Sequence, residues 1–184
     1  MGHLSSDGRP FTPAELSALE RAAVHLSLAS LPVPPLALDV PLLQRWHVLL
    51  SAGLPQLRPG QLRHTDITFG SFFGTAPTLI PTHLQTLIQV HQVQWTDLTL
   101  GSTDDEVLEH ATWVHAELLR IHPFWDGNGR LARHLQQWLC WQGGLPAPHY
   151  QHRPSYLAGL NRYHHTRDLT LLMDVTRQAL ASTS

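Results

Sequence analysis

The sequence predicts an all-α fold, a helical bundle, on two observations. Apolar residues recur at helical spacing along most of the chain, and prolines and glycines divide these stretches from one another. The clearest stretch, 103–121, begins with Thr-Asp-Asp-Glu, the pattern of a capping box. Its spacing predicts one buried face, formed by Val107, Leu108, Ala111, Val114, Leu118 and Leu119.

The other helices follow from the same kinds of signal. Residues 12–15, Thr-Pro-Ala-Glu, form a second capping box with proline at the first helical position, and Asp39 begins another helix. The proline-rich link 31–35 predicts a division into an N-terminal helix and link, 1–35, and one compact unit, 36–184. In order, the predicted helices cover residues 12–29, 39–50, 81–91, 103–121, 131–142, 154–165 and 168–180.

Length and composition are typical of a single globular domain that binds neither nucleic acid nor a membrane. A length of 184 residues suits one domain with a well-buried core. The formal net charge of −2, without a basic run, gives little support for nucleic-acid binding. We find no signal peptide and no membrane-length apolar run, and the one cysteine, Cys140, has the spacing of a core position. We therefore expect a cytoplasmic protein with no membrane partner. The 14 histidines do not predict a zinc site, because His110 and His115 are not spaced i, i+4.

The chemistry is concentrated in residues 122–130, His-Pro-Phe-Trp-Asp-Gly-Asn-Gly-Arg. Pro123 disfavours helical backbone at the residue before it, so His122 lies at the end of the preceding helix. A neutral imidazole there can accept the proton of a hydroxyl. The glycines on either side of Asn128 permit positive φ and allow backbone N–H groups to converge on an anion. The dipole of the following helix strengthens this field.

Three charged residues complete a site for phosphate chemistry. Arg130 and Arg133 oppose the dipole at the start of their helix, at roughly 0.3–1 kcal/mol each, and a bound polyphosphate would offset that cost. Spaced i, i+3, they lie on one face and suit forked contacts with phosphates. Asp126 is the natural ligand for Mg²⁺, which takes one or two carboxylates beside the phosphates of a nucleotide.

Together these residues resemble the signature of the Fic (Fic/Doc) family, His-Pro-Phe-x-(Asp/Glu)-Gly-Asn-Gly-Arg-x-x-Arg, and every fixed position is present. Residues 60–63, Gly-Gln-Leu-Arg, and the following 65–70 resemble the lead into the family's flap, a short β-hairpin over the active site. Relatives also have similar residues at three other places: Trp46 with His47, the helix that begins at Pro81, and Tyr156 after the motif. The resemblance covers roughly residues 36–180.

The resemblance implies a Fic-type helical bundle with this hairpin, and the transfer of AMP from ATP to a Ser, Thr or Tyr hydroxyl of a target protein, with release of pyrophosphate. His122 would be the base, and Asp126 would hold Mg²⁺. The target would pair with the flap as an extra strand, and Tyr156 would lie near the adenine. The residues that would bind the nucleotide or the flap's partner are Gly127, Asn128, Gly129, Arg130, Arg133, Ile67, Thr68, Phe69, Gly70 and Tyr156.

Two alternatives stand beside this interpretation. One is a Fic-type transferase of another phosphate-containing group, although Asp126 and Gly129 match the AMP-transferring pattern. The other is a nucleotide-binding or scaffold module without transfer, although the complete motif favours an enzyme. The flap aromatics Phe69, Phe72 and Phe73 likewise have two interpretations, an interaction surface or a hydrophobic clasp onto the body.

One family feature is missing from the sequence. Many relatives carry a helix with (Ser/Thr)-x-x-x-Glu-(Gly/Asn), whose glutamate pairs with the second motif arginine and blocks productive ATP binding. Only Glu106 has Ser or Thr four residues before it, and Val107 follows it, so the pattern fails. We therefore expect either a separate small antitoxin that supplies the glutamate or activity without that brake. A variant brake from Glu15 or Glu20 remains the competing hypothesis.

Overall fold

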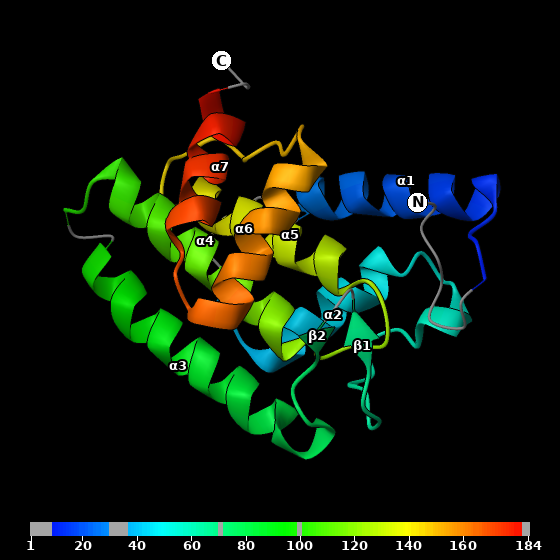
Figure 1. The fold of residues 1–184 in the computed structure, drawn as a ribbon. Helices are drawn as coiled ribbons and strands as arrows, with labels where there is room; N and C mark the ends of the chain where they lie inside the picture. The colour runs from blue at the N-terminus through cyan, green and yellow to red at the C-terminus, as the bar shows by residue number, and fades with distance from the viewer. Residues whose placement is uncertain (1–8, 30–36, 70–71, 99–100, 182–184) are drawn as a thin grey trace.

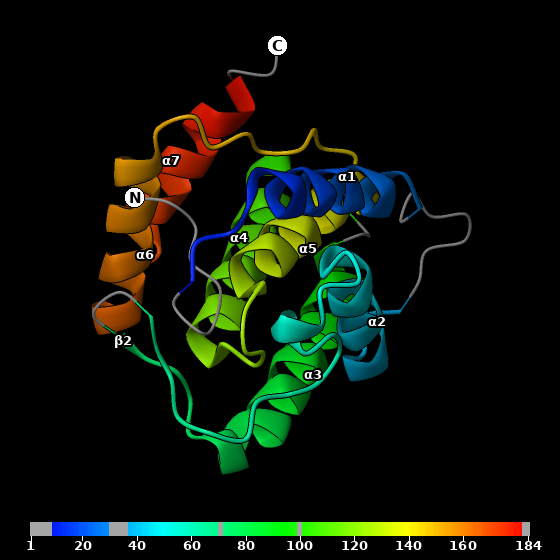
Figure 2. The same cartoon turned by 90° about the vertical axis from the view of Figure 1, so that its right-hand side faces the viewer.

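Two central helices, α4 (Asp104–Ile121) and α5 (Asn128–Gln142), carry the fold, and they pack closely against each other (Figures 1 and 2). The structure is a computed structural model, and it describes residues 9–29, 37–69, 72–98 and 101–181. The proline-rich link 31–35 and Gly70 lie outside the described residues. Around the central pair lie α1 (Pro13–Ala29), α2 (Val40–Leu50), α3 (Ile80–Leu98), α6 (Arg153–Thr166) and α7 (Thr170–Ala181).

The core confirms the predicted apolar pattern. All six residues predicted on the buried face of α4 are buried, and Cys140 is buried on α5. Removing this apolar surface from water is the main favourable term in folding, about 25 cal/mol per Å². The main core joins α2, α3, α4 and α5, and its largest fully buried side chains include Leu43, Leu84, Leu118, Phe124, Leu131 and Trp138.

Both predicted capping boxes are present. Thr103 Oγ1 accepts a hydrogen bond from the Glu106 N–H at 3.3 Å, and the Glu106 carboxylate accepts one from the Thr103 N–H at 2.7 Å. Thr12 and Glu15 make the same reciprocal pair at the start of α1. Asp39 caps α2 through the Leu42 N–H at 2.6 Å. Each cap satisfies backbone groups that a helix cannot satisfy internally.

Two helix boundaries differ from the prediction by more than two residues. Helix α3 continues to Leu98 instead of ending at residue 91, and α5 begins at Asn128 instead of at Leu131. Beyond His91 the sequence is mostly polar, so it has no apolar stripe that would predict a helix. The Trp95 ring nevertheless packs against His110 of α4, with 5.6 Å between ring centroids. This tertiary contact extends the helix where local pattern alone does not.

The predicted hairpin is present, and it is very short. It consists of β1 (Thr68–Phe69) and β2 (Phe72–Phe73), which pair antiparallel with Phe69 opposite Phe72. One more backbone bond, from Gly74 N–H to Ile67 O at 3.0 Å, extends the ladder. Figure 2 shows β2 beside α6 at the edge of the bundle.

Arg63 fastens the hairpin to the end of α4. Its buried guanidinium donates to the carbonyl of His122 at 2.7 Å, of Thr65 at 2.8 Å and of Thr75. These carbonyls belong to the end of α4 and to both ends of the hairpin segment. A single cation therefore ties the hairpin to the segment that carries His122.

Among the helices of the described segments, none is both long enough and apolar enough to cross a membrane.

Candidate active site

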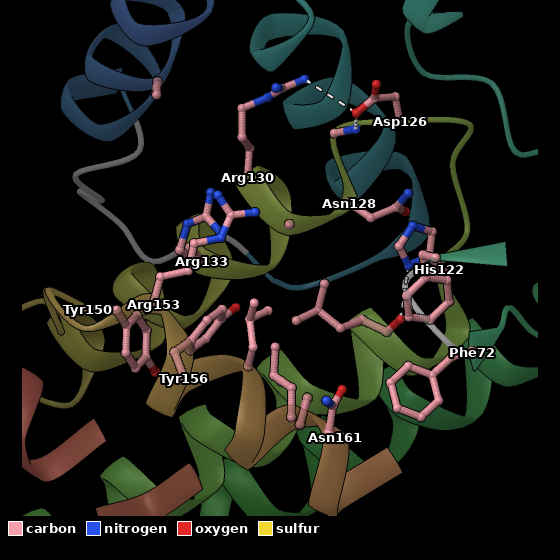
Figure 3. Close-up of a pocket in the computed structure, with 18 of the residues that line it drawn as sticks. Phe72, His122, Asp126, Asn128, Arg130, Arg133, Tyr150, Arg153, Tyr156 and Asn161 are labelled. Carbon is pink, nitrogen blue, oxygen red and sulfur yellow. Dashed lines mark hydrogen bonds and ion pairs between the residues drawn. The ribbon is translucent and has the colours of Figure 1, made fainter. Parts of the chain in front are cut away.

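A cavity of about 710 Å³ opens at the N-terminal end of α5 (Figure 3). Its wall combines α1, the hairpin, α4, the motif loop with the start of α5, Tyr150 and α6. Ile67 and Thr68 belong to the hairpin segment but do not line this cavity. The predicted site residues that do line it are Phe69, His122, Asp126, Gly127, Asn128, Gly129, Arg130, Arg133 and Tyr156.

His122 ends α4 in a left-handed conformation, with φ 51° and ψ 60°. Its Nδ1 lies 3.2 Å from the Leu119 carbonyl oxygen, which can only accept, so Nδ1 carries the ring proton. Nε2 therefore keeps its lone pair. Burial lowers the pKa of His122 to about 4, so the imidazole is neutral near pH 7. These are the properties of a general base.

The sequence predicts either a hydrophobic clasp onto the body or an interaction surface for the three phenylalanines of the hairpin, and the structure divides them between these roles. Phe69 stacks on the His122 ring, with 3.8 Å between centroids, and Phe72 lies 4.2 Å from the His164 ring of α6. These two rings act as the clasp. Phe73 points away and is 77 % exposed, so it alone remains a candidate for an interaction surface.

The motif loop is held closed by its own side chains. Asn128 donates from Nδ2 to the Phe124 carbonyl at 2.9 Å and accepts from the Phe124 N–H at 3.0 Å. Phe124 is completely buried and stacks on His47. Gly127 has φ 77°, and a Cβ there would lie 3.2 Å from His47 Nε2. Because the Asn128 side chain is used within the loop, its backbone N–H is the group that remains for a ligand.

His47 positions Asp126 from the adjacent helix α2. Its Nδ1 accepts from the Gly60 N–H at 2.9 Å, so the proton is on Nε2, which donates to the Asp126 carbonyl at 2.8 Å. Burial lowers the pKa of His47 to about 4 and keeps the ring neutral. The sequence singled out His47 only as a matching position and gave it no role.

The start of α5 presents backbone donors to the cavity. No side chain caps this helix, and its first internal bond runs from the Leu131 N–H to the Gly127 carbonyl at 2.9 Å. The N–H groups of Asn128, Gly129 and Arg130 precede that bond. Unpaired N–H groups at a helix N-terminus bind anions, and the helix dipole adds to the attraction.

Arg130 adds a partly buried cation. Its Nη2 lies 4.0 Å from Asp126 Oδ1, which is an ion pair without a hydrogen bond. Its Nε and Nη2 are buried and make no hydrogen bond within the described residues. Burial lowers the pKa of Arg130, and the nearby Asp126 opposes this. Buried donors of a charged group are costly to leave unpaired, so the arrangement favours an anionic ligand.

Asp126 is the carboxylate of the motif loop, and its Oδ1 accepts from the Gly127 N–H. Within the described segments, no group of three His, Cys, Asp or Glu side chains is arranged to hold a metal ion. A complete protein cage for a metal is therefore absent from those segments. One carboxylate beside an open helix N-terminus is an arrangement that suits Mg²⁺ when phosphates and water supply the remaining ligands.

Two residues of α6 that the sequence did not indicate, Arg153 and Asn161, also line the cavity (Figure 3). Glu20 of α1, one of the two glutamates considered as a variant brake, lines it as well. Tyr156, predicted near the adenine, is buried and lies 2.9 Å through its hydroxyl from His115 Nε2. Arg153 follows the motif by too many residues to belong to its spacing pattern, so only the packing of α6 reveals its place.

Comparison with known proteins agrees with this geometry. The model of the Fic/DOC family matches residues 37–140, which is more than half of the chain. Protein adenylyltransferase fic-1 of Caenorhabditis elegans is 32 % identical over 87 residues, covering 47 % of this chain and 16 % of the relative. Protein adenylyltransferase Fic of Nematostella vectensis is 41 % identical over 71 residues, covering 36 % of this chain and 17 % of the relative. The chain thus spans about a sixth of the length of these curated relatives.

Solved structures share the fold. Fic-1 from C. elegans superposes with a TM-score of 0.74 at 23 % identity, covering 91 % of this chain and 48 % of that one. The N-terminal Fic domain of a Bartonella quintana protein with bound ADP gives a TM-score of 0.72 at 16 % identity, covering 97 % and 90 %. Identities this low establish the fold alone. With the family model matched over more than half of its length, the chain belongs to the Fic/DOC family.

Proposed function

We propose that this protein is an adenylyltransferase that moves AMP from ATP to a Ser, Thr or Tyr hydroxyl of a target protein and releases pyrophosphate. One observation carries the proposal: the unprotonated Nε2 of His122 shares a cavity with the open N-terminus of α5 and the arginines of the motif. Adenylyltransferase is also the name of the relatives from C. elegans and N. vectensis.

In the proposed reaction, the target hydroxyl oxygen attacks the α-phosphorus of ATP. The new P–O bond forms as the bond to the β-phosphate oxygen breaks, and pyrophosphate leaves. His122 Nε2 takes the hydroxyl proton, while Nδ1 stays bonded to the Leu119 carbonyl and keeps the ring in place. General-base assistance of this kind contributes typically about 10²–10⁴-fold in rate.

The start of α5 would bind the phosphates. The backbone N–H groups of Asn128, Gly129 and Arg130 and the guanidinium groups of Arg130 and Arg133 supply donors and positive charge along one side of the cavity. Asp126 would hold Mg²⁺. When bound, Mg²⁺ neutralises phosphate charge and so favours both attack and departure of the leaving group.

The hairpin would align the target. An extended segment of the target would pair with the edge around Ile67, Thr68 and Phe69, and with Gly70 beyond them, so that main-chain bonds set the distance from the hydroxyl to His122. Support comes from the attachment of the hairpin to the His122 carbonyl through Arg63. Because pairing uses backbone groups, this mode tolerates different target sequences.

Regulation would come from outside the described site or would be absent. The sequence lacks the inhibitory glutamate motif, and no carboxylate of the described residues lies within 4.0 Å of Arg133. A separate small antitoxin carrying that glutamate would therefore bind across the arginines, or the enzyme would act without this brake.

Radiolabelled ATP tests the proposed activity. Incubation with Mg²⁺ and ATP labelled at the α-phosphate should label the protein itself or proteins of a lysate, whereas ATP labelled at the γ-phosphate should leave them unlabelled. His122→Ala is the matched negative control. Label from the γ-phosphate would indicate phosphate transfer instead, and no label from either position would contradict the proposed function.

A further inference from the structure

The cavity contains an arginine outside the motif. Arg153 is the first residue of α6, and it lines the same cavity as Arg130 and Arg133 of α5. Figure 3 draws the guanidinium groups of Arg133 and Arg153 on the same side of the cavity, next to Tyr156 and opposite His122. Burial raises the pKa of Tyr156, and the positive charges of Arg133 and Arg153 oppose this rise.

The Tyr156 hydroxyl contacts a buried histidine of α4, His115. His115 lies 2.9 Å away through Nε2, and burial keeps its pKa at about 4, so the ring is neutral. His115 Nδ1 makes no hydrogen bond within the described residues, so the contact with Tyr156 is the one that holds this ring in place. This 2.9 Å contact fixes the position of the Tyr156 hydroxyl on the cavity wall.

The cavity wall around Arg133 and Arg153 carries an excess of positive charge. Asp126 lies beside Arg130, and Glu20 of α1 is the other acid that lines the cavity. Within the described segments, neither Arg133 nor Arg153 has a carboxylate within 4.0 Å. Two cations on one side of the cavity, with no ion-pair partner in those segments, suit a ligand with concentrated negative charge.

We propose that Arg153 is a third phosphate-binding arginine, which contacts the terminal phosphate of the nucleotide and makes the site prefer nucleoside triphosphate over monophosphate. The inference rests on the proposed nucleotide chemistry of the same cavity. Arg153 lies across from the base, at the end where the distal phosphates and the departing pyrophosphate would lie, so the proposal places Tyr156 beside these phosphates instead of near the adenine. A guanidinium group suits this role because its planar fork matches two phosphate oxygens at once.

Calorimetric titration of Arg153→Gln with ATP, AMP and inorganic pyrophosphate, each with Mg²⁺, tests the proposal. ATP and pyrophosphate should bind about 10- to 100-fold more weakly than to the unaltered protein, because one charge-assisted contact is lost. AMP, which has no distal phosphate, should bind equally to both. Arg153→Lys keeps the charge and loses the fork, so its affinity for ATP should be intermediate.

Arg162→Gln is the matched control. Arg162 lies on the same helix, is about half exposed and pairs with Asp168 outside the cavity, so its loss changes the net charge equally. It should leave ATP affinity unchanged. Equal affinity of Arg153→Gln and unaltered protein for ATP would overturn the third arginine while the proposed function stands. An equal loss for AMP and ATP would also overturn it. Failure of the unaltered protein to bind ATP would contradict both proposals.

Discussion

The ring of Phe69 lies almost parallel to the imidazole of His122, with 3.8 Å between the ring centroids and 15° between the planes. Phe69 belongs to the hairpin and His122 to the end of α4, so a residue of the proposed flap covers the proposed base. This cover keeps water from the imidazole, and burial is the largest cause of its lowered pKa. The hairpin therefore governs both access to the base and its protonation.

This stacking predicts a pH dependence. Transfer by the unaltered protein should be equally fast at pH 6 and pH 8, because an imidazole with a pKa of about 4 is neutral at both. In Phe69→Ala, water reaches the ring and its pKa rises toward the ordinary 6.5, so only about a quarter of the molecules keep an unprotonated base at pH 6. The ratio of rates at the two pH values measures this. Phe69→Leu keeps an apolar cover and should retain the ratio near one, and an unchanged ratio in Phe69→Ala would contradict the argument.

Removal of the base should separate chemistry from binding. His122→Ala should lower the transfer rate by about 10²–10⁴-fold while ATP affinity stays near that of the unaltered protein, because the imidazole acts on the hydroxyl and not on the nucleotide. Single-turnover rates and calorimetry together check this. His149→Ala, an exposed histidine outside the cavity, is the control. Normal transfer by His122→Ala would remove His122 from the role of base.

The proposed magnesium ligand predicts a metal dependence. Asp126→Asn keeps the size of the side chain and removes its charge, so added Mg²⁺ should no longer strengthen ATP binding, as it should in the unaltered protein. Asp97→Asn on α3, exposed and outside the cavity, is the matched control. ATP titrations with Mg²⁺ and with a chelator give the comparison. An undiminished Mg²⁺ effect in Asp126→Asn would show that the metal ligand lies elsewhere.

Features set by local chemistry could be predicted from the sequence. The capping boxes at Thr12 and Thr103 depend on residues three apart, and the burial of Phe124 follows from an aromatic ring between two helices. The motif loop is likewise local, because Asn128 bonds to Phe124 four residues earlier. The resemblance to the Fic family supplied the hairpin, whose two-residue strands have too little pattern to be predicted alone.

Features set by distant contacts could not be predicted. Trp95 extends α3 through a contact with α4 that no local periodicity indicates. Arg153 faces the motif only because α6 packs beside α4. The sequence left the choice between Glu15 and Glu20 open, and the packing of α1 on α2 and α5 decides it by bringing Glu20 to the cavity wall. A position on a helix gives a residue's spacing along that helix, and the neighbouring element decides which residues it meets.

The hairpin edge predicts a defect confined to the protein substrate. Thr68→Pro removes a backbone donor and disturbs pairing at Thr68, which lies opposite Phe73. Modification of the target should be impaired, whereas ATP binding should be spared because Thr68 does not line the cavity. Thr68→Ala keeps the backbone N–H and should modify the target normally. Normal modification by Thr68→Pro would argue against strand pairing.

The two glutamates considered as variant brakes have different surroundings. Glu15 caps α1 and pairs with Arg9 at 2.8 Å, and it does not line the cavity. Hydrogen bonds from Arg9 and from Thr12 lower its pKa to about 2. Glu15 is therefore occupied at the start of its helix. Glu20 does line the cavity, as Arg133 does, and it is the acid that a brake within α1 would use.

Glu20→Gln decides between an internal brake and an unrestrained site. Glu20 is exposed and makes no ion pair with Arg133 within 4.0 Å, so its charge acts on ATP only through solvent. Exposed charge interactions are worth about 0.2–1 kcal/mol, so Glu20→Gln should raise autotransfer by no more than about five-fold. Glu109→Gln, exposed and outside the cavity, controls for net charge. Activation well above five-fold in Glu20→Gln alone would mean that α1 carries the brake and that no separate antitoxin is needed to supply the inhibitory carboxylate.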